Sequence, residues 1–113
     1  MHELGLCSEL YDTLLDLMER EKLSVISDVT LTVGEATAVV PKYMNDCWPA
    51  VIDGTKLAAT RLHVNFKKAL GRCHDCEREY VISDFHGHCP HCGGEDYDML
   101  SGYEFEISEI IGH

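Results

Sequence analysis

Two short cysteine pairs constrain this chain more than any other feature. Each pair has the spacing Cys-x-x-Cys, and twelve residues separate the two pairs. Such a pair places two thiolates at the tip of a tight turn, and the spacer is long enough to bring the tips together. Four sulfur ligands predict a tetrahedral Zn²⁺ site that stabilises structure, because no coordination position is left open for a substrate. The four cysteines are Cys73, Cys76, Cys89 and Cys92.

The alternative to a zinc site is a redox-active motif or a disulfide within a pair. A single Cys-x-x-Cys motif leaves that alternative open, whereas two pairs at this separation favour zinc. Gly93-Gly94 follows the second pair. Glycine adopts the positive φ that such zinc-binding turns require. We therefore expect a structural Zn²⁺ ion and reduced thiols.

Acidic residues dominate the charge of the chain. There are 20 Asp and Glu against 9 Lys and Arg, which gives a formal net charge of -11 at pH 7. This charge repels the phosphate backbone of nucleic acids and attracts metal cations, so we expect no nucleic-acid partner. The sequence shows neither a basic and apolar leader nor a long apolar run, so we expect a cytoplasmic protein without a membrane span.

Apolar periodicity predicts two helices. Apolar residues recur at helical spacing over residues 4–23, opposite an acidic outer face. Pro41 begins a second helical pattern, and proline suits the first turn of a helix. Asp53-Gly54 is a typical stop signal. Pro49 falls inside this pattern and should kink or shorten the helix, because proline removes a backbone donor.

Three segments alternate apolar and polar residues, as strands with one buried face do: residues 29–33, 62–66 and 103–107. The second strand enters the cysteine region and the third leaves it, so we expect these two strands to be neighbours in one sheet. The prediction is an α+β fold with a three-stranded sheet and two helices on one face. A zinc-ribbon-like cysteine module (residues 69–100) is inserted between strands two and three of the larger domain (residues 1–68 and 101–113).

The amino terminus, Met1-His2-Glu3, offers a second set of metal ligands. A free α-amine, the next backbone amide and the His2 imidazole form fused chelate rings, and this nearly planar nitrogen set suits Ni²⁺ or Cu²⁺. Glu3 adds either its amide nitrogen or its carboxylate. The alternative is a solvated, frayed terminus, and these three residues alone do not decide between the two.

Other candidate ligands have simpler interpretations. Cys7 and Cys47 lie on the apolar faces of their helices and are expected to be core residues. Glu35 is expected to cap the second helix or to contact a partner. Four histidines of the cysteine module are expected to be solvated, the alternative being a second metal site or additional nickel ligands. They are His74, His86, His88 and His91.

Short blocks along nearly the whole chain form a specific succession. They are Met1-His2-Glu3-Leu4, Val33-Gly34-Glu35, Val39-Val40-Pro41, Cys89-Pro90-His91-Cys92-Gly93 and Ser101-Gly102-Tyr103-Glu104-Phe105-Glu106-Ile107. Their order and spacing resemble the HypA/HybF family of hydrogenase-maturation nickel metallochaperones. The chain departs from the common family pattern at Ala36-Thr37-Ala38 and lacks the carboxylate that some relatives carry near Val40.

This resemblance implies a nickel metallochaperone and not an enzyme. Nickel, as exchangeable cargo, would bind His2 with the Met1 amine and Glu3, which makes the larger domain the nickel-binding one. The four paired cysteines would hold zinc. The implied partners are a maturation GTPase and the large-subunit precursor of a [NiFe]-hydrogenase, and some family members also supply urease. The chain would be a monomer or a homodimer.

A different class of function is a zinc-ribbon module that binds other proteins without transferring nickel. Such a module predicts zinc alone, whereas a metallochaperone predicts one zinc and one exchangeable nickel per chain. An enzyme is the weakest option, because the motifs assemble no Ser-His-Asp set, no phosphate-binding loop and no metal site with an open position.

Overall fold

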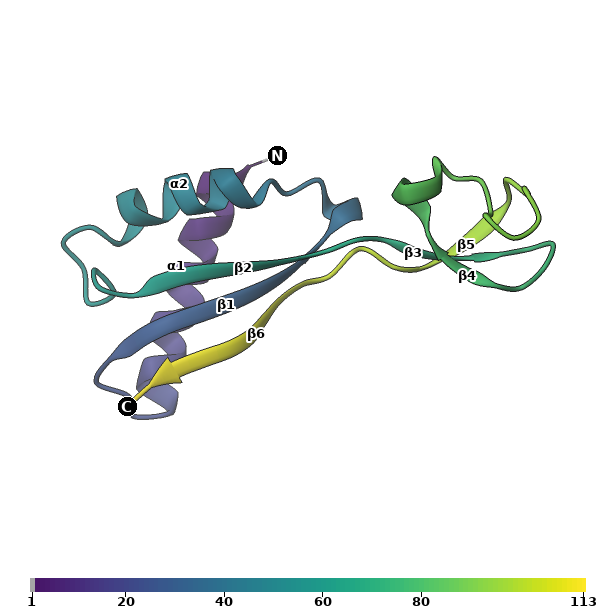
Figure 1. Cartoon of the computed structure of the whole chain (residues 1–113). Helices are drawn as coiled ribbons and strands as arrows, with labels where there is room; N and C mark the ends of the chain where they lie inside the picture. The colour runs from purple at the N-terminus through teal and green to yellow at the C-terminus, as the bar shows by residue number, and fades with distance from the viewer. Residues whose placement is uncertain (1) are drawn as a thin grey trace.

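The computed structural model describes residues 2–113, which form two small sheets placed end to end (Figure 1). In chain order the elements are α1 (Glu3–Arg20), β1 (Ile26–Gly34), the 3-10 turn η1 (Glu35–Thr37), α2 (Pro41–Ile52), β2 (Arg61–Lys67), β3 (Leu70–Cys73), β4 (Glu79–Val81), the 3-10 turn η2 (Ile82–Phe85), β5 (Tyr97–Ser101) and β6 (Phe105–Gly112). The larger sheet has the order β2-β1-β6, and the smaller has the order β4-β3-β5. The molecule is elongated, with principal extents of 54 × 25 × 16 Å.

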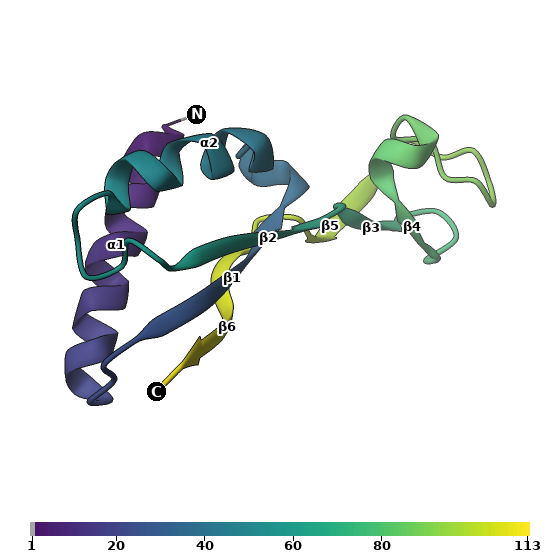
Figure 2. The ribbon, with the colours of Figure 1, turned by 60° about the vertical axis from the view of Figure 1, so that its left-hand side comes forward.

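Both helices cover one face of the larger sheet (Figure 2). Apolar residues three or four positions apart form the buried side of each helix, and alternate residues of β1 face them. This apolar core confirms the α+β prediction. Its main contributors are Cys7, Leu10, Leu14 and Met18 of α1, Val29, Leu31 and Val33 of β1, and Met44, Trp48 and Ile52 of α2. Within residues 2–113, no helix combines the length and the apolar character needed to cross a membrane.

The prediction that the second and third strands of the larger sheet are neighbours is wrong. β1 lies in the centre, parallel to β2 and antiparallel to β6, so the strands that enter and leave the cysteine module do not pair with each other. The physical reason is that α2 connects β1 to β2, and a strand-helix-strand unit places its two strands side by side and parallel. The apolar strand β1 therefore has a neighbour on each side and is not an edge strand.

Several boundaries differ from the expectation. α1 ends at Arg20, because Lys22 adopts a positive φ of 55° and the Leu23 N–H returns to the Met18 carbonyl at 2.9 Å. α2 ends at Ile52, directly before the expected stop at Asp53-Gly54, so Pro49 does not shorten it. Pro49 is exposed, as is Asn45 one turn earlier, and the Asn45 carbonyl that loses its helical partner can bond to water.

The third strand begins later than expected and runs further. β6 starts at Phe105 and includes Ile110 and Ile111, which the alternation had placed after the strand. Its register against β1 shifts beside Ser108, whose hydroxyl donates to the Thr30 carbonyl at 3.3 Å. This bulge lets both Ile107 and Ile110 pack against the core, and it explains why simple alternation misplaced the strand.

A joint between the two parts forms around η1. The Ala69 N–H donates to Glu35 Oε1 at 3.0 Å, and the Ala36 N–H donates to the Gly102 carbonyl at 2.8 Å. Gly34 lies so close to the Gly102 carbonyl that any side chain at Gly34 would collide with it. The Glu35 side chain therefore does not cap α2, and it is engaged in a hydrogen bond within the chain. It binds the backbone of the strand connection that enters the cysteine module.

Candidate metal centres

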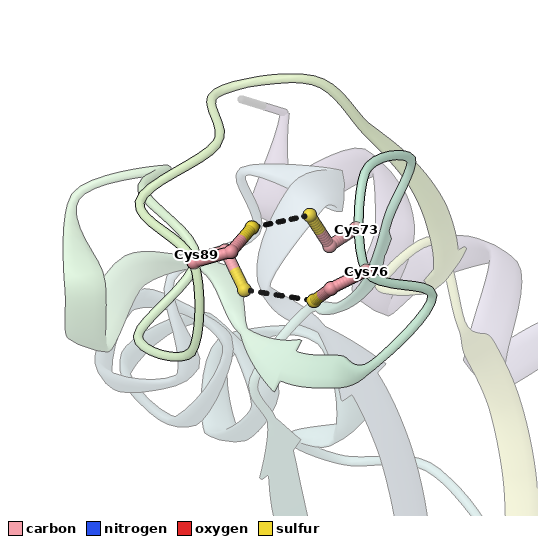
Figure 3. Close-up of side chains that lie close together, drawn as sticks. Cys73, Cys76 and Cys89 are labelled. Atoms are coloured by element: carbon pink, nitrogen blue, oxygen red, sulfur yellow. Dashed lines mark hydrogen bonds between the residues drawn. The ribbon is translucent and has the colours of Figure 1, made fainter.

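The four paired cysteines come together at the end of the smaller sheet (Figure 3). Cys73 ends β3, Cys76 lies in the turn that follows it, and Cys89 and Cys92 lie in a turn after η2. All four Sγ atoms lie within 4.8 Å of one another. The Sγ atoms of Cys73 and Cys92 are 3.5 Å apart, and those of Cys76 and Cys89 are 3.6 Å apart.

The two cysteine turns share one backbone design. In each turn the first cysteine accepts a hydrogen bond at its carbonyl from the residue four positions later: Glu77 N–H to Cys73 and Gly93 N–H to Cys89. Both donors have positive φ, 62° at Glu77 and 79° at Gly93. Glycine was expected only at the second turn, and the first turn adopts the same conformation with glutamate. The two turns, which have the same backbone conformation, bring their two pairs of sulfur atoms together.

A Zn²⁺ ion fits this set of sulfur atoms. Tetrahedral coordination with Zn–S bonds of about 2.3 Å places neighbouring sulfurs about 3.8 Å apart. Two of the Sγ–Sγ distances, 3.5 and 3.6 Å, fall just below that separation, and no pair is further apart than 4.8 Å. Small side-chain adjustments therefore suffice to bind the ion.

The ionisation of the thiols also favours a bound cation. Burial opposes ionisation of Cys89, but the N–H groups of His91 and Cys92 outweigh it and lower the pKa of Cys89 to about 7. The Gly94 N–H favours the Cys92 thiolate, yet the neighbouring Cys73 thiol and burial prevail and raise the pKa of Cys92 to about 12. Four thiolates so close together require a compensating positive charge, which a divalent metal supplies.

At the other candidate centre, the His2 side chain is exposed and directly precedes α1. The His2 carbonyl accepts the Leu6 N–H at 3.0 Å, so the backbone at His2 already belongs to the first turn of the helix. Met1, whose amine the sequence proposes as a nickel ligand, lies outside the described residues.

Glu3 has a structural role that sequence reasoning missed. Its side chain is buried, and Oε2 accepts the Val40 N–H at 3.2 Å, immediately before the first residue of α2. This hydrogen bond lowers the pKa of Glu3 against the opposing effect of burial. A carboxylate at this position also complements the positive end of the α2 dipole. Because Glu3 and Val40 lie 37 residues apart, no local pattern could reveal the contact.

The two candidate centres are separate. The start of α1 lies beside α2, whereas the cysteine module projects from the far side of the joint in both views (Figures 1 and 2). Among residues 2–113, the four cysteines are the only group of three or more metal-ligating side chains that meet. His2 therefore belongs to no group of three or more such side chains among the described residues.

The remaining histidines and cysteines behave largely as expected. His74, His86, His88 and His91 are all exposed. Asp98, 2.9 Å from His74, raises the pKa of that histidine. Cys7 is fully buried, and burial raises the pKa of its thiol to about 11. Cys47 is half-buried against the same core. Both cysteines are packing residues of the larger domain.

Comparison with known proteins identifies relatives over the full length. The family described as "Hydrogenase/urease nickel incorporation, metallochaperone, hypA" matches residues 1–111. The hydrogenase maturation factor HypA of Geotalea uraniireducens is 38% identical over 85 residues, which cover 75% of this chain and 77% of that protein. The hydrogenase maturation factor HybF of Klebsiella pneumoniae is 30% identical over 112 residues, or 99% of each chain.

Solved structures share the same fold. The solution structure of the Ni metallochaperone HypA from Helicobacter pylori matches with a TM-score of 0.66 at 18% identity, over 97% of this chain and 96% of that one. A second HypA solution structure matches with a TM-score of 0.70 at 17% identity, over 100% and 97% of the two chains. The chain therefore belongs to the HypA family of hydrogenase and urease nickel-incorporation metallochaperones.

Proposed function

We propose that the chain binds Ni²⁺ at its amino terminus and delivers it during [NiFe]-hydrogenase maturation, with urease as a further acceptor. Its partners are a maturation GTPase and the large-subunit precursor of the hydrogenase. The larger domain (1–68 and 101–113) carries nickel, and the cysteine module (69–100) holds a structural zinc ion on Cys73, Cys76, Cys89 and Cys92. None of the six cysteines forms a disulfide, which suits the reducing cytoplasm.

The observation that carries the nickel proposal is the contact between Glu3 and Val40. Because the Glu3 carboxylate is bound to the Val40 N–H, it is not free to reach a metal at the terminus. The first N–H groups of a helix have no helical partner, so the backbone nitrogens at positions 2 and 3 can release their protons to solvent when nickel binds. We therefore assign the Met1 amine, these backbone nitrogens and the His2 imidazole as ligands, with Glu3 contributing nitrogen rather than its carboxylate.

This arrangement suits ligand exchange, the step that a delivery protein must perform. An exposed terminal site lets an acceptor replace one ligand at a time, whereas a closed thiolate site does not. Imidazole must be neutral to bind nickel, so nickel is released as pH falls through the range in which histidine gains a proton. The Glu3 contact meanwhile fixes the start of α1 against the start of α2.

The test is nickel binding by equilibrium dialysis of the full chain. His2→Ala and a variant with one residue added before Met1 should each lose stoichiometric nickel while keeping one zinc per chain. His86→Ala, which removes another exposed histidine, is the matched control and should keep both metals. Nickel bound normally by either terminal variant would contradict the proposal, and zinc alone in the unmodified chain would favour a protein-binding zinc module.

A further inference from the structure

β6 is an open edge of the larger sheet (Figures 1 and 2). Within residues 2–113, β1 is its only strand neighbour, so the outer side of its backbone has no strand partner. Edge strands usually carry lysine or proline to prevent pairing with other chains, and Phe105–Gly112 contains neither. The register against β1 shifts beside Ser108 and again between Ile26 and Asp28, and both shifts leave the stretch from Phe105 to Ile107 regular.

A shallow apolar groove runs between this edge and α1. Its cavity volume is about 290 Å³, and Leu6 and Leu10 of α1 line it opposite Phe105 and Ile107 of β6. Phe105 is 39% exposed although it lies on the helix-facing side of the sheet, opposite Val33. No described segment covers these side chains, so a chain lying along β6 would bury apolar surface and gain backbone hydrogen bonds together.

The surroundings of the edge are acidic on both sides. On the helix-facing side, Glu9 of α1 lines the groove. Glu106 and Glu109 pair with Thr32 and Thr30 on the sheet face that the helices leave open. Two copies of β6 side by side would bring like charges together, which disfavours a second copy of this chain as the occupant. The net charge of -11 favours a basic partner instead.

We propose that the β6 edge binds an extended segment of another protein in which apolar residues alternate with lysine or arginine. The segment would add a fourth strand to the larger sheet, pairing first with the regular stretch from Phe105 to Ile107. Its apolar side chains would enter the groove beside Leu6 and Leu10. Its basic side chains, which point to the opposite face, would lie beside Glu106 and Glu109. A segment of about six residues matches an ordinary strand.

The proposal uses neither the nickel ligands nor the four cysteines, so its test is independent of metal binding. The probe is a capped synthetic heptapeptide that alternates lysine and valine, titrated into the ¹⁵N-labelled, zinc-loaded protein. Amide signals of β6 and of Leu6 and Leu10 should shift in a saturable way. Peptides in which glutamate replaces lysine, or in which alternate backbone nitrogens are methylated, should bind at least about tenfold more weakly, because they lose charge complementarity or main-chain bonds.

A matched protein variant sharpens the test. The double substitution Glu106→Lys and Glu109→Lys should weaken the lysine peptide about tenfold and improve the glutamate peptide. The double substitution Glu19→Lys and Glu21→Lys, which makes the same charge change near the end of α1, should leave both affinities unchanged. Binding that survives methylation, that maps outside β6, or that responds equally to both variants would overturn the proposal, as would sedimentation showing that β6 pairs with a second copy.

Discussion

The larger domain contains thirteen buried apolar residues in one core among those described, whereas the core of the cysteine module contains three: Cys73, Tyr80 and Cys89. Two of these three are metal-ligand candidates. Tyr80 contacts the rings of Phe85 and Tyr97 edge-on, at centroid distances of 6.4 and 6.1 Å. So small a core does not offset the entropy of ordering about thirty residues. One part is therefore stabilised by apolar burial, whereas the other has too small a core to be stabilised in the same way.

Removing the metal should unfold the cysteine module and leave the larger domain folded. A strong chelator, or Cys73→Ser, should abolish the ordered amide signals of the cysteine module completely, because metal binding is its main source of folding free energy. The larger domain should remain folded, as reported by the fluorescence of Trp48, the only tryptophan. Cys47→Ser, which alters a half-buried cysteine outside the module, is the control. A module spectrum that survives zinc loss would refute the comparison.

The opposite perturbation targets the apolar core. Leu14 is fully buried in α1, so Leu14→Ala should lower the free energy of unfolding of the larger domain by about 3 kcal/mol. Urea titration followed by Trp48 fluorescence measures the change, and the zinc content should stay at one per chain. Leu4→Ala on the same helix, where the side chain is 57% exposed, should change the stability by less than about 0.5 kcal/mol. Equal effects of the two substitutions would contradict the assigned core.

A substitution at the joint should have a smaller effect on stability and act mainly on the orientation of the two parts. Glu35→Ala removes the acceptor of the Ala69 N–H and should cost about 1 kcal/mol. Its main effect should be on orientation, so ¹⁵N relaxation should show the two parts tumbling more independently than in the unmodified chain. Glu21→Ala, at an exposed position after α1, should leave the relaxation rates unchanged. Identical tumbling in the two variants would show that Glu35 does not hold the joint.

The last prediction concerns the pH dependence of stability and Asp28 on the open face of the larger sheet. His63, followed by Ser27 and Arg61, holds the pKa of Asp28 at about 2. A lowered folded-state pKa stabilises the fold fully above the unfolded value of about 3.9, and this contribution is lost as pH falls toward 2. Asp28→Asn should therefore lower the urea midpoint at pH 6 and have little effect at pH 2. Asp12→Asn should change neither midpoint, and a pH-independent loss in Asp28→Asn would contradict this account.

Patterns local in sequence predicted most elements of this fold. The alternation of Val29, Leu31 and Val33 located β1, and helical spacing located both helices. The phased cysteine pairs predicted a module that the structure closes around four neighbouring sulfur atoms. These features were readable because each depends on residues a few positions apart, where backbone geometry fixes the relation between side chains.

Contacts between distant segments were not predictable in the same way. Alternation identifies which face of a strand is buried but not which strand lies beside it, so the central position of β1 was missed. The hydrogen bonds from Val40 to Glu3 and from Ala69 to Glu35 each join residues more than thirty positions apart. The strands β3, β4 and β5 were also missed, because each has at most five residues and little apolar alternation.

Because the chain enters and leaves the cysteine module at the same joint, the module could be removed or replaced without altering the larger domain. A side chain at Gly102 would touch that of Ala69, so the points where the chain enters and leaves the module are in contact. In topological terms the whole module is a long insertion at one position of the larger domain. A linker of a few residues between Ala69 and Gly102 would close the larger domain without the module, and a different segment could be inserted at the same place.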